Sequence, residues 1–210
     1  MTDQTARGSP TAWLAVGCAL IWFVAAASAG PSEIWQAIGG AAVVLGVAVL
    51  LLDRPTLGAL LRPTPRLLLW GLASGGVMTA ATYILYPMLA NRLPFITTET
   101  ELLYAAFRTP SPMLAAIALG PVIVGEELVW RGVVQAALVR RLGPWAGVTV
   151  AAVAYALVLV PLGSPVMVAA ALLCGLFWGT LRITTASLVP TLVAHLLWDG
   201  VVLLWLPLDT

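Results

Sequence analysis

The chain has 210 residues, of which 61% are hydrophobic and only 9% are charged, and its formal net charge is +1. A water-soluble domain is excluded because such domains carry about 25% charged residues. Disorder is excluded because disordered chains are poor in apolar residues. Nucleic acid is excluded as a partner because its binding requires a basic patch, whereas these arginines are scattered near the ends of apolar runs. The chain is therefore expected to lie in a lipid bilayer.

Apolar runs between turn residues predict an all-α, polytopic transmembrane helix bundle with about seven spans. The runs cover residues 12–29, 35–52, 67–90, 112–139, 144–162, 165–182 and 186–206, and a break from Pro161 to Pro165 separates the fifth from the sixth. The first run has a second interpretation as a secretory signal, because Ala27-Ser28-Ala29 resembles a cleavage site.

The arginines predict that the amino terminus is cytoplasmic. In that orientation seven arginines face the cytoplasm and two, Arg92 and Arg108, face the opposite side, as the positive-inside rule requires. The seven are Arg7, Arg54, Arg62, Arg66, Arg140, Arg141 and Arg182. We therefore expect a multi-pass protein of the cell inner (plasma) membrane.

The longest loop, residues 91–110, contains a capping-box pattern formed by Thr98 and Glu101. With the apolar residues that follow, this pattern predicts a short interfacial helix before the fourth span. A solvated loop with one helical turn is the alternative.

Two glycine pairs, Gly71 with Gly75 and Gly175 with Gly179, have the spacing at which helix backbones approach each other closely. We interpret both pairs as helix-packing sites.

Five ionisable residues lie in the middle of predicted spans, where each charge costs roughly 2.5–3.5 kcal/mol on insertion scales. They are Glu126, Glu127 and Arg131 in the fourth span and His195 and Asp199 in the last. Glu127 and Arg131 are four residues apart and can pair on one helix face, which leaves Glu126 as a candidate general base. His195 and Asp199 also share a face, although they could serve only to hold helices together. One cavity containing both groups would suit hydrolysis by activated water or proton-coupled transport.

These residues resemble the motifs of the CPBP family, the CAAX protease and bacteriocin-processing (Abi) intramembrane proteases. The resemblance rests on Glu126-Glu127-x-x-x-Arg131, Gly175-x-x-x-Gly179 leading through Arg182, Ser187-Leu188 and His195-x-x-x-Asp199, within residues 112–205. It implies an all-helical, glutamic-type endopeptidase in which Glu126 activates water, Glu127 and Arg131 support the site, and His195 with Asp199 binds the substrate's carbonyl oxygen.

The sequence departs from the family at a second motif, Phe-x-x-x-His, where it reads Tyr155-Ala-Leu-Val-Leu159. Leu159 stands in place of the histidine, and Tyr155 could at best supply a hydroxyl. The base Glu126 therefore lacks the histidine that would assist it in orienting the water. A zinc site is not expected, because zinc hydrolases normally offer three protein ligands. We predict no metal and no cofactor.

We divide the chain into amino-terminal membrane helices with their loop (1–111) and a CPBP-like core (112–210), both within one membrane domain. The predicted function is hydrolysis of a peptide bond in a membrane-associated protein or peptide of a bacterial membrane. The alternative is a non-catalytic family member that acts as a membrane binding or immunity protein.

Overall fold

The computed structural model describes residues 12–30, 33–108 and 111–208, and every regular element within these ranges is a helix. This confirms the all-α fold. In chain order the elements are α1 (Ala12–Ser28), η1 (Trp35–Gly39), α2 (Gly40–Leu52), α3 (Arg54–Leu60), α4 (Pro65–Arg92), α5 (Phe95–Phe107), α6 (Pro112–Glu126), η2 (Glu127–Val134), α7 (Gln135–Leu142), α8 (Pro144–Leu157), η3 (Val160–Leu162), α9 (Pro165–Thr185), α10 (Val189–Asp199) and η4 (Gly200–Trp205).

The starts of three long helices are encoded by a hydroxyl residue followed by proline. The pairs are Thr64-Pro65 before α4, Ser111-Pro112 before α6 and Ser164-Pro165 before α9. Each hydroxyl accepts a hydrogen bond from a backbone N–H in the first turn, at 3.2–3.3 Å. Proline fits the first helical position because the N–H that it lacks would have no partner there. These pairs fix where the helices begin.

All seven predicted apolar runs are helical. Five helical stretches are long and apolar enough to cross a membrane, and the first and last, Ala12–Ser28 and Val189–Trp205, are shorter apolar helices. Large apolar side chains such as Leu69 and Ile84 of α4 are exposed on the bundle's outer surface, as expected for a surface that contacts lipid. The chain is a multi-pass membrane protein, and seven spans stay a prediction.

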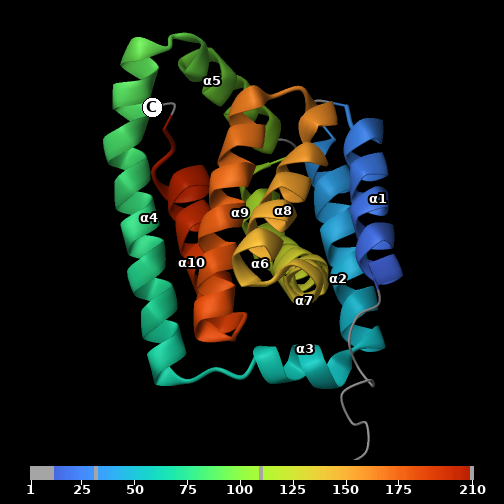
Figure 1. Cartoon of the computed structure of the whole chain (residues 1–210). Coiled ribbons are helices and arrows are strands. Elements are labelled where there is room, and N and C mark those ends of the chain that lie inside the picture. The colour runs from blue at the N-terminus through green and yellow to red at the C-terminus, as the bar shows by residue number, and fades with distance from the viewer. Residues whose placement is uncertain (1–11, 31–32, 109–110, 209–210) are drawn as a thin grey trace, which may run out of the picture.

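The helices enclose a central stretch formed by α6, η2 and α7 (Figure 1). The long α4 stands at one edge of the bundle beside α10, and α1 stands at the other edge. Helix α3 and the start of α4 lie at one end of the bundle, while α5 and the carboxyl-terminal segment lie at the other (Figure 1). The cytoplasmic position of the amino terminus stays a prediction, and Arg7, on which it partly depends, lies outside the described residues.

Glycines allow the closest helix contacts. A Cβ atom added at Gly71 or Gly75 would lie within 3.0 Å of α10 atoms, and one added at Gly175 would lie 3.0 Å from Ala152 of α8. The interpretation of both glycine pairs as packing sites is therefore confirmed. The tightest approach was not predicted: a Cβ atom at Gly125 would lie 2.1 Å from the carbonyl oxygen of Ala42, so α2 and α6 touch through their backbones.

Helix α5 corrects one prediction. It begins at Phe95, with Pro94 at its N-cap and no side-chain cap hydrogen bond, so Thr98 and Glu101 lie inside the helix and form no capping box. The reason is that the chain turns directly from the end of α4 into α5 through Pro94, and the N–H of Ile96 donates to the carbonyl of Leu93. The solvated-loop alternative is wrong, because the helix continues for 13 residues.

Candidate active site

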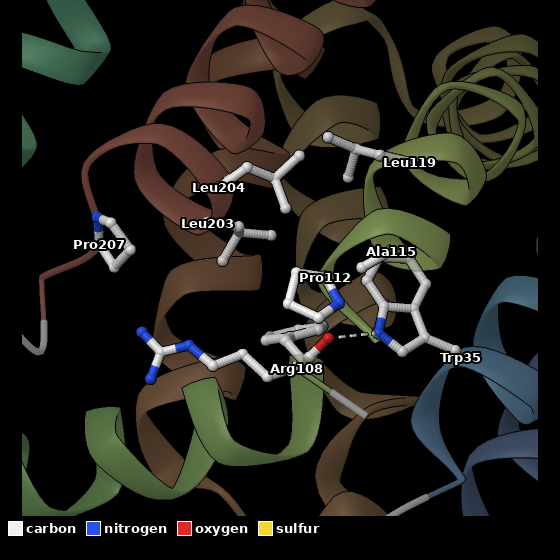
Figure 2. A pocket seen from close by; sticks show the side chains of 9 residues that line it. Trp35, Arg108, Pro112, Ala115, Leu119, Leu203, Leu204 and Pro207 are labelled. Atoms are coloured by element: carbon white, nitrogen blue, oxygen red, sulfur yellow. Dashed lines mark hydrogen bonds between the residues drawn. The ribbon is translucent and has the colours of Figure 1, made fainter. Parts of the chain in front are cut away.

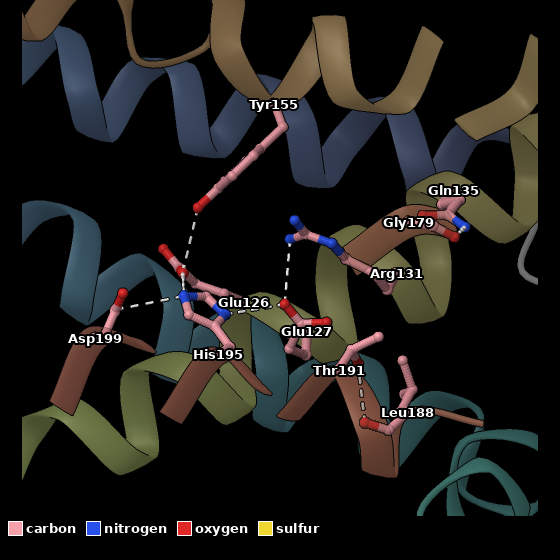
Figure 3. A network of polar contacts seen from close by, with 10 residues as sticks. All are labelled: Glu126, Glu127, Arg131, Gln135, Tyr155, Gly179, Leu188, Thr191, His195 and Asp199. Carbon is pink, nitrogen blue, oxygen red and sulfur yellow. Dashed lines mark hydrogen bonds and ion pairs between the residues drawn. The ribbon is translucent and has the colours of Figure 1, made fainter. Parts of the chain in front are cut away.

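The structure brings the two predicted polar groups together in the interior of the bundle (Figure 3). One group comes from the junction of α6 and η2, and the other comes from α10, more than 60 residues later in the chain. The cluster contains all five predicted residues: Glu126, Glu127, Arg131, His195 and Asp199. We call it the polar cluster.

Glu127 is the centre of the polar cluster and is fully buried, with 0% of its side chain exposed. Its Oε1 atom lies 3.3 Å from Nη1 of Arg131, so the pair expected from the four-residue spacing is present. The same oxygen lies 3.0 Å from Nδ1 of His195. Glu127 therefore links the two helices and fixes the orientation of the imidazole ring, because a carboxylate can only accept the hydrogen bond from Nδ1.

The other two carboxylates lie on the opposite side of the His195 ring. Oδ2 of Asp199 is 3.4 Å from Nε2, and Oε2 of Glu126 is 3.7 Å from the same nitrogen. Both carboxyl side chains keep some exposure, 13% for Asp199 and 11% for Glu126, whereas Glu127 has none. The two adjacent glutamates thus have different surroundings, as their positions on the helix predicted.

The backbone from Glu127 onward is wider than the α-helix assumed from the sequence, and the backbone of the second polar segment widens only after Asp199. Hydrogen bonds in η2 and η4 follow the π-helical pattern, and η2 starts at Glu127 while η4 starts directly after Asp199. The pairing of Glu127 with Arg131 survives this change. Such π-helical turns are rare and occur frequently at functional sites.

Trp178 is a part of the site that the sequence analysis missed. Its ring stacks on that of His195, with centroids 3.6 Å apart and an interplanar angle of 23°. The guanidinium carbon of Arg131 lies 5.2 Å from the Trp178 ring centroid on which it packs. The signal in the sequence was its position directly before Gly179, a packing glycine on α9.

Tyr155 reaches the polar cluster from α8, and Leu159 does not. The Tyr155 hydroxyl donates to Oε2 of Glu126 at 3.3 Å (Figure 3). Leu159 follows the end of α8 at Leu157 and is buried in the apolar core. The position at which the resemblance expects a histidine is therefore occupied by an apolar core residue.

A cavity of about 210 Å³ lies beside the end of α5 (Figure 2). Its walls are mainly apolar and include Leu119 of α6, Leu203 of η4 and the side chain of Arg108. Leu119 precedes Glu126 by seven residues, which corresponds to about 10 Å along an α-helix. None of the residues of the polar cluster lines this cavity, so the two features are separate.

Residues 107–201, just under half of the chain, match a family model named Rce1-like and described as type II CAAX prenyl endopeptidase Rce1-like. No curated protein and no solved structure matches the chain. The matched residues include the whole polar cluster, and the family supports a CAAX-protease-like intramembrane endopeptidase. Residues 107–201 are therefore similar to Rce1-like CAAX endopeptidases, which confirms the resemblance predicted from the motifs.

Proposed function

We propose that this protein is a glutamic-type intramembrane endopeptidase that hydrolyses a peptide bond of a membrane-associated protein or peptide. The observation that carries the proposal is the contact between the two polar segments, in which Oε2 of Glu126 lies 3.7 Å from Nε2 of His195. A base and a potential oxyanion donor are thereby adjacent within the segment that matches the family. Ionisable side chains inside a membrane protein are costly, so a group of five favours a functional role.

In the proposed reaction Glu126 is the general base. It takes a proton from water while the water oxygen attacks the carbonyl carbon of the substrate, and the electron pair of the C=O bond moves onto oxygen. The resulting oxyanion is stabilised by Nε2–H of His195. The C–N bond then breaks, and the proton held by Glu126 passes to the leaving nitrogen.

The remaining residues position His195. Its Nδ1 donates to Glu127, so Nε2 can also donate to an oxyanion only when the ring carries both protons. Arg131 compensates the charge of Glu127, and Asp199 orients the ring from its other side, 3.4 Å from Nε2. Neither a metal nor a cofactor has a role in this reaction.

We propose that the substrate is cleaved near the membrane-embedded end of its chain. Both reacting residues are buried inside the bundle, so the scissile bond must enter between helices. We place the protein in the inner membrane of a bacterium with its amino terminus in the cytoplasm, on the basis of its arginine distribution.

A second candidate function is a non-catalytic membrane binding or immunity protein with the same polar core. The observation that favours it is Leu159, which is apolar and buried where the resemblance expects a histidine. A buried polar cluster can also be retained for helix association. The two functions differ in whether peptide bonds are cleaved.

The test replaces Glu126 with Gln in the native host, which keeps the size of the side chain but removes its capacity to take a proton. Membrane-protein fragments are compared with those of wild type by mass spectrometry. The matched control is Glu101→Gln on α5, where the side chain is exposed. We expect specific fragments to disappear with Glu126→Gln only, at equal protein levels. Identical fragments in all three strains would refute catalysis by Glu126 and favour the binding function.

A further inference from the structure

Tyr155 supplies the polar contact between α8 and the proposed base. Its hydroxyl donates to Oε2 of Glu126 at 3.3 Å and is buried in the bundle (Figure 3). Oε2 is also the atom that faces His195. The phenol and the imidazole therefore lie on the same side of this carboxyl group.

The Tyr155 ring has little freedom to move. The ring of Trp130 packs against it with centroids 5.0 Å apart, and the Arg131 guanidinium carbon lies 4.9 Å from its centroid. On the α9 side, the absence of a side chain at Gly175 lets α8 and α9 pack closely beside Tyr155. A ring that is confined on several sides holds its hydroxyl at a fixed point, so the contact is preorganised.

The contact distinguishes the two oxygens of Glu126. Within the described part of the chain, the hydrogen bond and the ion pair of this carboxyl group both involve Oε2. A phenol can donate only one hydrogen bond, and an ionised carboxylate can only accept. Donation by Tyr155 to Oε2 therefore leaves Oε1 to receive a proton from water.

We infer that Tyr155 is a positioning residue, whose hydroxyl holds Oε2 of Glu126 so that Oε1 is directed at the attacking water. This inference rests on the proposed function, because a base needs a fixed orientation only if it takes a proton in a reaction. It gives α8 a role that Leu159 cannot supply, since that side chain has no polar atom.

Removal of the hydroxyl should slow the chemical step and leave substrate binding unchanged. Displacement of a catalytic group by about 1 Å can cost roughly 100-fold in rate. The loss of a single long hydrogen bond should cost less than this 100-fold. We therefore expect Tyr155→Phe to lower kcat roughly tenfold at constant KM. The phenylalanine ring retains the packing against Trp130 and Arg131.

The test uses the full-length protein in vesicles of phosphatidylethanolamine and phosphatidylglycerol. The probe is a synthetic peptide that spans the cleavage site found by the Glu126→Gln comparison, and both kcat and KM are measured. The variants are Tyr155→Phe, Glu126→Gln and the double variant. The matched control is Tyr83→Phe, because the Tyr83 hydroxyl donates to the Leu206 carbonyl, away from the polar cluster.

The expected result is a tenfold lower kcat for Tyr155→Phe, an unchanged Tyr83→Phe enzyme, and no further loss when Tyr155→Phe is added to Glu126→Gln. An unchanged kcat, a kcat and KM that change together, or an equal loss in Tyr83→Phe would overturn the role of Tyr155 and leave the proposed base in place. If Glu126→Gln removes no fragments and so supplies no peptide, the proposed function fails, and the inference about Tyr155 fails with it.

Discussion

Replacement of Arg131 by Met should destabilise the protein strongly, because it leaves a charge in the interior without its main partner. Glu127 is fully buried, and Arg131, with 2% exposure, lies 3.3 Å from it. Removal of one member of a buried ion pair costs about 3–5 kcal/mol. For a chain of this length each kcal/mol lowers Tm by about 2–4 °C, so we expect a decrease of about 6–20 °C.

The same reasoning predicts partial recovery when the remaining charge is also removed. The double variant Arg131→Met/Glu127→Gln should be at least about 1 kcal/mol more stable than Arg131→Met alone, since it contains no uncompensated buried carboxylate. It should not reach wild-type stability, because Met cannot replace the packing of the guanidinium between Tyr155 and Trp178.

Thermal unfolding in detergent micelles, followed by the fluorescence of the nine tryptophans at one scan rate, measures both effects. The control is Arg141→Met, because Arg141 is exposed at the end of α7 and its replacement should cost less than about 0.5 kcal/mol. The reasoning is refuted if Arg131→Met melts at the same temperature as the control. It is also refuted if the double variant is no more stable than Arg131→Met.

Three further predictions concern packing, the imidazole and metal dependence. Gly125→Ala should prevent accumulation of folded protein, because the added Cβ would lie 2.1 Å from the Ala42 carbonyl oxygen. The control Gly120→Ala on the same helix, where an added Cβ meets nothing within 4 Å, should behave as wild type in size-exclusion chromatography. If the elution profiles of Gly125→Ala and Gly120→Ala are the same, the close contact at Gly125 is contradicted. Trp178→Leu should lower kcat roughly tenfold by freeing the ring of His195, on which Trp178 stacks at 3.6 Å; an unchanged kcat in folded protein would show that the stacking has no catalytic value. Incubation with 1,10-phenanthroline or EDTA should leave peptide cleavage unchanged, and a loss that zinc restores would disprove the metal-free mechanism.

The helices could be predicted because the signals that define them are local. Apolar runs end at turn residues, and pairs such as Ser111-Pro112 mark a helix start within two positions. The capping box predicted at Thr98 was wrong because a second local signal, Pro94, lies nearby. The turn at Pro94 starts the helix three residues before Thr98. Two local signals competed, and the sequence alone did not show which one would decide the boundary.

The residues of the polar cluster could also be singled out from the sequence, because charges in the middle of apolar runs are rare. Their meeting could not be derived from periodicity, since the contact between Glu127 and His195 joins helices that are far apart in the chain. The stacking of Trp178 on His195 depends equally on how α9 packs against α10. Tryptophan is common in this chain, with nine copies, so its type alone gave no signal.

The backbone contact between Ala42 and Gly125 limits how far the two halves of this protein can change independently. Helix α2 lies outside residues 107–201, yet it touches the residue directly before Glu126. A chimaera that combines this core with the amino-terminal helices of an Rce1-like protein would need small residues at the same crossing. The amino-terminal half is therefore not an interchangeable module, and its sequence should evolve together with that of the core at this one point.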